Sequence, residues 1–136
     1  MQSSDLRWLD FKALLDLHRR LLEETGGCDG VLKPEALESA LERPHTEIGG
    51  VRLFPSLFAK AAALAHSVAT THPFVDGNKR AALGAAATVL CLNGFIIDVD
   101  NEGAVAATLH LARKEWSLEQ FAAWLEANAV PATPEE

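Results

Sequence analysis

The feature that most constrains the fold is the stretch LFAKAAALAHSVATT, residues 57–71. Ala and Leu, two strong helix formers, dominate it, and Lys60 and His66 are its only titratable side chains. A helix that is apolar on every side is normally buried on every side. We therefore expect a helix from Ser56 or Leu57 to Thr71 in the interior of the protein.

The rest of the composition also favours helices. The 136 residues include no Tyr and few β-branched residues, which are the types that strands prefer. A chain of this length buries roughly two-thirds of its unfolded surface in one core and is too short to expect two cores. The prediction is a single all-α domain over residues 1–136, a bundle of about six helices.

Start and stop signals place the other helices. The first is capped by Asp10, runs over residues 11–25 and ends at Gly26–Gly27. The second begins at Pro34, which suits the first helical position, and Pro44 stops it. The others are expected at residues 78–93, closed by Gly94; from Asp100 or Asn101 to near Glu115; and from Ser117, which forms a capping box with Gln120, to near Asn128. The inner stripe of the first helix is expected to be Leu14, Leu17 and Leu21.

Three segments lack a helical pattern. Residues 44–55, PHTEIGGVRLFP, carry two glycines and no period, so we expect a flap-like loop with a short extended piece at Val51–Phe54. FIIDV, residues 95–99, is β-prone, and its expected partner is Arg7–Leu9. The tail VPATPEE, residues 130–136, is expected to be frayed.

The net charge and the cysteine content limit which classes of binding partner and which cellular compartment are expected for this protein. The formal net charge of −7 gives no general attraction for a phosphate backbone, so nucleic acid is not expected as a direct partner. The sequence has no uncharged apolar stretch of the roughly 18 residues that a membrane helix needs, and the polar residues after Met1 do not resemble a leader. Cys28 and Cys91 have no metal or disulfide spacing. We expect a cytoplasmic protein with no membrane partner, with Cys28 as a loop thiol and Cys91 as a buried core thiol.

A polar motif, HPFVDGNKR at residues 72–80, separates the third helix from the fourth. A Gly-Asn step into a helix lets backbone N–H groups converge where the helix dipole is positive, which favours a bound phosphate. Lys79 and Arg80 have the wrong sign for that end of a helix unless an anion offsets them. Arg80 offers phosphate a bidentate fork and Lys79 a mobile charge, while Asp76 is a hard oxygen ligand for a Mg²⁺ that bridges two phosphates.

The start of the motif supplies a base. His72, with an ordinary pKa of about 6.5, is largely neutral at cellular pH and can accept a proton from a hydroxyl nucleophile. Pro73 stiffens the loop and Phe74 anchors it in the core. The nine residues therefore predict a phosphoryl- or nucleotidyl-transfer site.

Simpler interpretations exist for each residue taken alone. A histidine before proline is common in turns and Asp-Gly-Asn is ordinary turn chemistry, but turns do not explain two cations at a helix start. The spacing of His66 and His72 fits no helical pair, so a two-histidine metal site is not expected, and His66 is interpreted as a core or supporting histidine. The other histidines are expected to be surface or satisfied side chains and the tryptophans to fill the core: His18, His45, His110, Trp8, Trp116 and Trp124.

HPFVDGNKR resembles the Fic motif, and its Lys-Arg ending followed by Ala-Ala-Leu resembles the Doc (death-on-curing) branch of the Fic family. LKPEALESALERP, LCLNGF, the third helix and the first helix with its Gly-Gly end are similar to that branch as well. The resemblance covers nearly the whole chain and implies a helical fold with the motif loop between two central helices. It implies that His72 is the catalytic base, that Asp76 binds Mg²⁺, and that the phosphate cradle consists of Gly77, Asn78, Lys79 and Arg80.

Two positions differ from the Fic proteins that transfer AMP, which usually have Gly in place of Lys79 and Arg in place of Leu83. The Doc branch shares both differences, and the resemblance implies its activity, phosphoryl transfer from ATP to a hydroxyl of elongation factor Tu. Such toxins are held by a small antitoxin in trans. The inhibitory (Ser/Thr)-x-x-x-Glu-(Gly/Asn) helix of self-restrained Fic proteins has no match here: its nearest counterpart, TGGCDG from Thr25, has Asp29 in place of Glu and is too Gly-rich to be helical.

We therefore expect a toxin of a type II toxin–antitoxin system, a Doc-like protein serine/threonine kinase that uses the γ-phosphate of ATP with Mg²⁺ and blocks translation. An antitoxin helix is expected to fill the groove over the motif and to pack against the flap around Leu53 and Phe54. Two alternatives remain open: a Fic-type adenylyltransferase that uses the same loop, and a catalytically silent Fic-fold module that binds a partner or a nucleotide.

Overall fold

The structure is a computed structural model that describes residues 6–132. Within these residues the chain forms six α-helices and two short antiparallel strand pairs, so the all-α prediction is confirmed. The elements are α1 (Phe11–Thr25), α2 (Pro34–Glu42), a 3-10 turn (Arg43–His45), β1 (Glu47–Ile48), β2 (Val51–Arg52), α3 (Leu57–Thr71), α4 (Asn78–Leu92), β3 (Phe95–Ile97), α5 (Asn101–Ala112), α6 (Leu118–Asn128) and β4 (Ala129–Pro131). No helix in this part of the chain is both long enough and apolar enough to cross a membrane.

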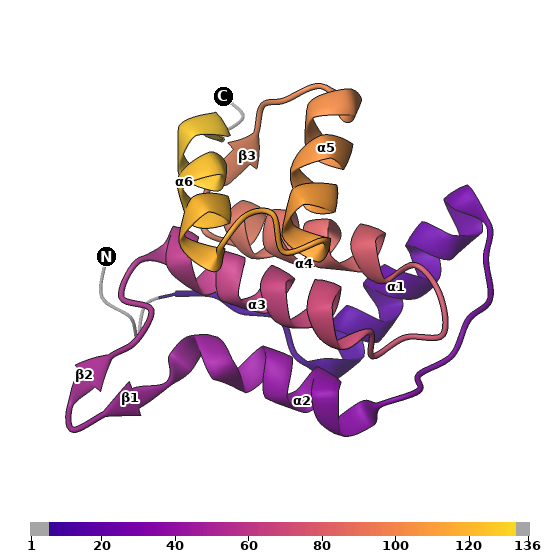
Figure 1. The fold of residues 1–136 in the computed structure, drawn as a ribbon, viewed down its shortest axis with the longest axis horizontal. Helices are drawn as coiled ribbons and strands as arrows, with labels where there is room; N and C mark the ends of the chain where they lie inside the picture. Colours follow the sequence, from indigo (N-terminus) through magenta and orange to yellow (C-terminus); the bar gives the residue numbers. More distant parts are fainter. Residues whose placement is uncertain (1–5, 133–136) are drawn as a thin grey trace.

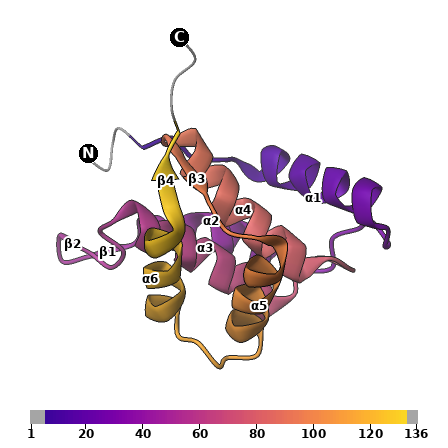
Figure 2. The same cartoon turned by 90° about the horizontal axis from the view of Figure 1, so that it is seen from above.

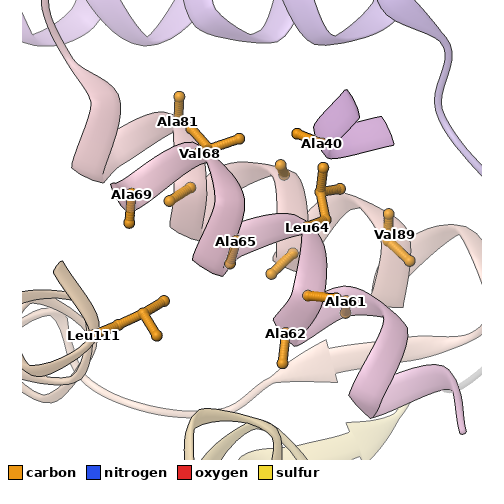
Figure 3. Close-up of a cluster of buried hydrophobic side chains, with 14 of the residues drawn as sticks. Ala40, Ala61, Ala62, Leu64, Ala65, Val68, Ala69, Ala81, Val89 and Leu111 are labelled. Carbon is orange, nitrogen blue, oxygen red and sulfur yellow. The ribbon is translucent and has the colours of Figure 1, made fainter. Parts of the chain in front are cut away.

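Helix α3 is the centre of the fold. It lies beside α4, with α2 on one side of this pair and α5 and α6 on the other (Figure 1). Residues 61–65 of α3 are completely buried. Figure 3 shows the side chains of α3 among buried residues from three neighbouring helices, Ala40 of α2, Ala81 and Val89 of α4, and Leu111 of α5. The apolar stretch is therefore the interior helix that its composition predicts.

Side-chain caps fix most of the helix starts. Asp10, Ser56, Asp100 and Ser117 each accept a backbone N–H in the first turn of α1, α3, α5 and α6, and α2 begins with a proline. Helix α4 differs, because its N-cap is Gly77 and no side chain caps it. The helix that begins inside the motif thus keeps its first N–H groups available to another acceptor.

Strand β3 pairs with β4 in an antiparallel ladder (Figure 2), and the expected pairing with Arg7–Leu9 is wrong. Helix α6 packs on α3 and ends beside β3, where the Asp98 N–H donates to the Asn128 carbonyl at 2.8 Å. The residues that directly follow α6, Ala129–Pro131, therefore lie next to β3 and pair with it. A short β-prone segment carries no information about which distant segment lies beside it.

The expected fraying of the C-terminal tail is wrong where the tail is described. Val130 and Pro131 belong to β4 and face Ile96 and Phe95. Residues 133–136 lie outside the described residues.

Residues 44–55 contain a short hairpin where a loop was expected, and the expected extended piece at Val51–Phe54 is confirmed at Val51–Arg52, which form β2. Strands β1 and β2 form an antiparallel hairpin that adjoins the first residue of α3, whereas His72 follows the last (Figure 1). A helix of this length spans roughly 22 Å. The hairpin and the residues around Leu53 and Phe54 therefore lie at the opposite end of α3 from the motif loop.

Two expectations about buried faces are corrected. Cys91 is exposed, because α4 directs Ala86, Val89 and Leu90 inward and leaves Cys91 off that face. Cys28 is an exposed loop thiol, as predicted.

The buried stripe of α1 is shifted by one position from the predicted one. It consists of Leu14, His18 and Leu22, while Leu17 and Leu21 are half-buried. The error arose because a histidine was not counted among the residues that can face the core.

Candidate active site

His72 is the residue at which the chain leaves α3. Its backbone lies in the left-handed region, with φ 51° and ψ 59°, which few residues other than glycine adopt. This conformation turns the chain sharply out of the helix. The side chain is exposed, so its imidazole is accessible to a group that docks against the loop.

The next residues of the motif, 73–75, are held by backbone contacts with residues 30–33, the segment that leads into α2. Val31 and Phe74 form an antiparallel bridge. Leu32 and Lys33 N–H both donate to the Pro73 carbonyl, at 2.8 and 3.1 Å, and Val75 N–H donates to the Gly30 carbonyl at 3.0 Å. Sequence analysis missed this support, because no local signal marks residues 30–33 as the partner of residues 73–75.

Phe74 anchors the loop in the core, as predicted, and is only 1% exposed. The carboxamide of Asn78 hydrogen-bonds both to its N–H and to its carbonyl. The side chain of Asn78 is therefore engaged within the loop. The group that Asn78 offers to a phosphate in this arrangement is its backbone N–H.

The start of α4 carries the features of an anion site. Gly77 is the N-cap in a left-handed conformation, with φ 76°, and α4 has no acidic residue in its first turn. The exposed side chains of Lys79 and Arg80 lie in that turn, where positive charge is unfavourable without a partner anion. Arg80 makes one long contact, from Nη1 to the Gly26 carbonyl at 3.4 Å. The arrangement favours a bound phosphate group.

The Asp76 carboxylate lies between the motif and the connection from α1 to α2. Its Oδ1 accepts the Gly77 N–H at 2.8 Å, and its Oδ2 lies 3.4 Å from the Cys28 nitrogen. Mg²⁺ is often held by one or two carboxylates together with the phosphates of a substrate. Among residues 6–132, no cluster of three or more acidic, His or Cys side chains could hold a metal. The exposed Asp76 carboxylate beside the start of α4 is an oxygen donor of the kind that Mg²⁺ prefers.

Gly27 permits this close approach. A Cβ at this position would lie 2.7 Å from Asp76 Oδ2 and 2.9 Å from Leu22 Cδ2, and its φ of +120° is unfavourable for other residues. The predicted helix stop is thus also part of the site. The Gly-Gly pair gave the signal for the end of α1 but not for this contact.

His18 is the main site residue that sequence analysis missed. It lies on α1, is 1% exposed, and its Nε2 lies 2.7 Å from the backbone oxygen of Asp76. Its ring also stacks on Phe74. The only sequence signal was its spacing of four residues from Leu14 and from Leu22, which places a polar side chain on the apolar face of the helix.

Two other histidines, His45 and His66, lie outside the motif and have lowered pKa values. Arg43 Nη1 donates to His66 Nδ1 at 3.0 Å. Burial is the main cause that lowers the pKa of His66, and the positive charge of the Arg43 guanidinium lowers it further. Burial is likewise the main cause that lowers the pKa of His45, and the positive charge of the Lys60 ammonium lowers it further. The three tryptophans pack against the core, as expected: Trp8, Trp116 and Trp124.

The sequence is similar to known proteins over most of its length. The Fic/DOC family profile matches residues 8–90, which include the whole motif. Toxin Doc of Mycolicibacterium smegmatis is 40% identical over 98 residues, which cover 71% of this chain and 75% of that protein.

Proposed function

The chain belongs to the Fic/DOC family, and on that basis we propose that it is the toxin of a type II toxin–antitoxin system. We infer that it acts in the cytoplasm as a serine/threonine kinase. Its substrates are ATP and a hydroxyl group of a protein, for which elongation factor Tu is the proposed target, so that translation stops. The observation that carries the proposal is the uncapped start of α4, with two cations in its first turn, in the same loop as His72 and Asp76.

The residues have distinct roles in the proposed reaction. His72 accepts the proton of the acceptor hydroxyl while that oxygen bonds to the γ-phosphorus. The bond from the γ-phosphorus to the β–γ bridging oxygen breaks, and ADP leaves. The N–H groups at the start of α4, the Arg80 guanidinium and the Lys79 ammonium hold and neutralise the phosphates. Asp76 would hold the Mg²⁺, which when bound offsets further negative charge on the nucleotide.

Lys79 and Leu83 favour transfer of the γ-phosphate over transfer of AMP. Which phosphorus is attacked depends on which phosphate lies in line with the acceptor hydroxyl. Leu83 lies one turn after Lys79 and packs against the core, at the position where AMP-transferring relatives in the wider family have a cation for the far phosphates. A nucleotide bound with its γ-phosphate beside His72 does not need that cation.

We propose that the activity of the toxin is inhibited by a separate protein, an antitoxin that acts in trans. The TGGCDG segment, the nearest counterpart of an inhibitory helix, is the non-helical connection between α1 and α2 after Thr25. That connection supports the motif loop through Cys28 and Gly30. We infer that a separate protein must cover the site.

ATP that carries the label at one chosen phosphorus distinguishes transfer of the γ-phosphate from transfer of AMP. The purified protein is incubated with elongation factor Tu, Mg²⁺ and ATP labelled at either the α- or the γ-phosphorus, with His72→Ala as the control. We expect label on the target only from the γ position and none with the variant. Label from the α position would establish AMP transfer in its place. Binding of ATP without transfer from either position would support the silent binding module.

A further inference from the structure

We propose that His18 is a positioning residue for the phosphate site, acting through the Asp76–Gly77 peptide. This inference rests on the proposed function, because the site that His18 positions is the one assigned to nucleotide phosphates. His18 lies on α1 and outside the motif, 58 residues before Asp76.

The hydrogen bond fixes the state of the His18 ring. Its Nε2 lies 2.7 Å from the backbone oxygen of Asp76, and a carbonyl oxygen can only accept, so Nε2 must carry the proton. Its Nδ1 lies 3.6 Å from Asp29 Oδ1, and Arg19 Nε lies 3.7 Å from the other carboxylate oxygen of Asp29. The ring thus donates to the motif through Nε2, while the exposed Asp29 carboxylate lies beyond hydrogen-bond distance of Nδ1.

The same ring packs flat against the motif. The ring centroids of His18 and Phe74 are 3.7 Å apart and the ring planes differ by 8°. His18 therefore contacts the loop on both sides of Val75, at the Phe74 ring and at the Asp76 carbonyl. The backbone of Phe74 is itself held by Asn78. With 1% exposure, it has no access to water that could replace either contact.

The peptide that His18 holds sets the direction of two parts of the site. The Asp76 carbonyl and the Gly77 N–H belong to one planar peptide group, and that N–H donates to the Asp76 carboxylate. A Cβ at Gly77 would lie only 3.5 Å from His18 Nε2, so the ring lies directly against the left-handed turn that begins α4. Rotation of this peptide would move the carboxylate and the first N–H groups of α4 together.

Three substitutions separate the hydrogen bond from simple core filling. His18→Gln places an amide donor near the position of Nε2, whereas His18→Asn ends near the position of Nδ1 and cannot reach the carbonyl. His18→Phe keeps an aromatic ring for Phe74 but removes the donor. The control is His110, a partly exposed histidine that hydrogen-bonds to the Glu115 carboxylate at 2.8 Å and stacks on the Trp116 ring, but lies outside the motif loop.

The first measurement needs neither nucleotide nor target. The Gly77 amide resonance in a ¹H–¹⁵N spectrum reports on the hydrogen bond to the carbonyl of the same peptide. We expect it to stay near its wild-type position in His110→Asn and to move in His18→Asn and His18→Phe; His18→Phe is the decisive variant, because it keeps a ring beside Gly77 and removes only the donor. An unmoved resonance in both of these variants, with folding confirmed by circular dichroism, would overturn the proposal.

The second measurement is Mg²⁺-ATP affinity together with γ-phosphate transfer. Outer partners that orient a ligating carboxylate typically contribute about 10- to 100-fold to affinity or activity, so we expect losses of that size in His18→Asn and His18→Phe and a much smaller loss in His18→Gln. If His18→Phe retained full binding while His18→Gln lost it, the stacking contact would be what matters and the positioning role would be wrong. If the wild-type protein transferred no phosphate, the proposed function would fail, while the Gly77 resonance and the binding data would still decide the role of His18.

Discussion

The carboxamide of Asn78 holds the backbone of Phe74 from both directions. Its Oδ1 accepts the Phe74 N–H at 2.9 Å, and its Nδ2 donates to the Phe74 carbonyl at 3.0 Å. One side chain in the first turn of α4 therefore closes the motif loop on itself. The asparagine of the motif therefore shapes the candidate site through its side chain.

Asn78→Ala should destabilise the protein as well as impair the site. Both hydrogen bonds are partly buried, and their loss leaves two backbone groups without these partners, so the free energy of unfolding is expected to fall by about 1 to 3 kcal/mol. Urea denaturation measures this loss. Asn78→Asp, which keeps the acceptor but points a carboxylate at a carbonyl, is expected to be at least as unstable; unchanged stability in both variants would show that the two bonds contribute little.

His72→Ala should remove catalysis while leaving nucleotide binding intact. The imidazole is assigned to the acceptor hydroxyl and not to the phosphates, so turnover is expected to fall by about 10²- to 10⁴-fold with an unchanged Kd for Mg²⁺-ATP. In cells, solitary expression of the wild-type chain is expected to arrest growth, and the variant to relieve the arrest. Equal turnover by the two proteins would exclude His72 as the base.

Asp76→Ala and Arg80→Ala should instead weaken the binding of Mg²⁺-ATP itself. Hydrogen bonds to charged groups contribute about 1.5 to 3 kcal/mol, which corresponds to an affinity loss of roughly 10- to 100-fold. Both side chains are exposed, so thermal stability should change little. Titration calorimetry measures the affinity, and Asp76→Asn, which keeps an oxygen for the Gly77 N–H but lacks the charge, separates the loop contact from the metal contact. Wild-type affinity in Asp76→Asn would argue against a metal ligand at this position.

Lys60 should control the mobility of the β1–β2 hairpin. This lysine is 1% exposed and donates a hydrogen bond to the Phe54 carbonyl at the root of the hairpin, and burial, followed by the charge of Arg52, lowers its pKa. Lys60→Met keeps the apolar stem but frees the carbonyl, so limited trypsin digestion after Arg52 is expected to become several-fold faster. Lys12→Met, at an exposed lysine on α1, is the control. Equal rates of cleavage in all three proteins would mean that Lys60 does not hold the hairpin.

His66 should make the protein less stable as the pH falls. Because burial and Arg43 lower its pKa below the usual 6.5, the unfolded chain binds a proton at a higher pH than the folded chain does. The stabilisation is therefore complete above about pH 6.5 and is lost as the pH falls toward the lower folded pKa. His45 has a pKa shifted in the same direction and adds to this dependence.

His66→Asn isolates that contribution. The asparagine oxygen lies near the position of Nδ1 and can still accept from Arg43, but it does not titrate. We expect urea denaturation at about pH 7.5 and about pH 5.5 to give a smaller loss of unfolding free energy for the variant than for the wild type. A loss of the same size in both proteins would show that other groups produce the pH dependence.

Features that depend only on residues close together along the chain could be predicted from the sequence. Caps such as Asp10, Ser56 and Ser117 act within one helical turn, so the starts of α1, α3 and α6 were predicted correctly. The composition of residues 57–71 was enough to identify the interior helix. The motif likewise placed five polar side chains, those of His72, Asp76, Asn78, Lys79 and Arg80, close together in the loop and the first turn of α4, because nine consecutive residues cannot be far apart.

Features that depend on which distant segments meet became visible only in the folded chain. The pairing of β3 with Ala129–Pro131, the support of Pro73 by Leu32 and Lys33, and the contact of His18 with Asp76 each join residues that no local pattern relates. The side of α4 on which Cys91 lies also depends on the helices packed around it. The physical reason is that helix caps and turns are set by backbone geometry over a few residues, whereas the partner of a strand edge or of a buried donor is set by how whole helices pack around α3.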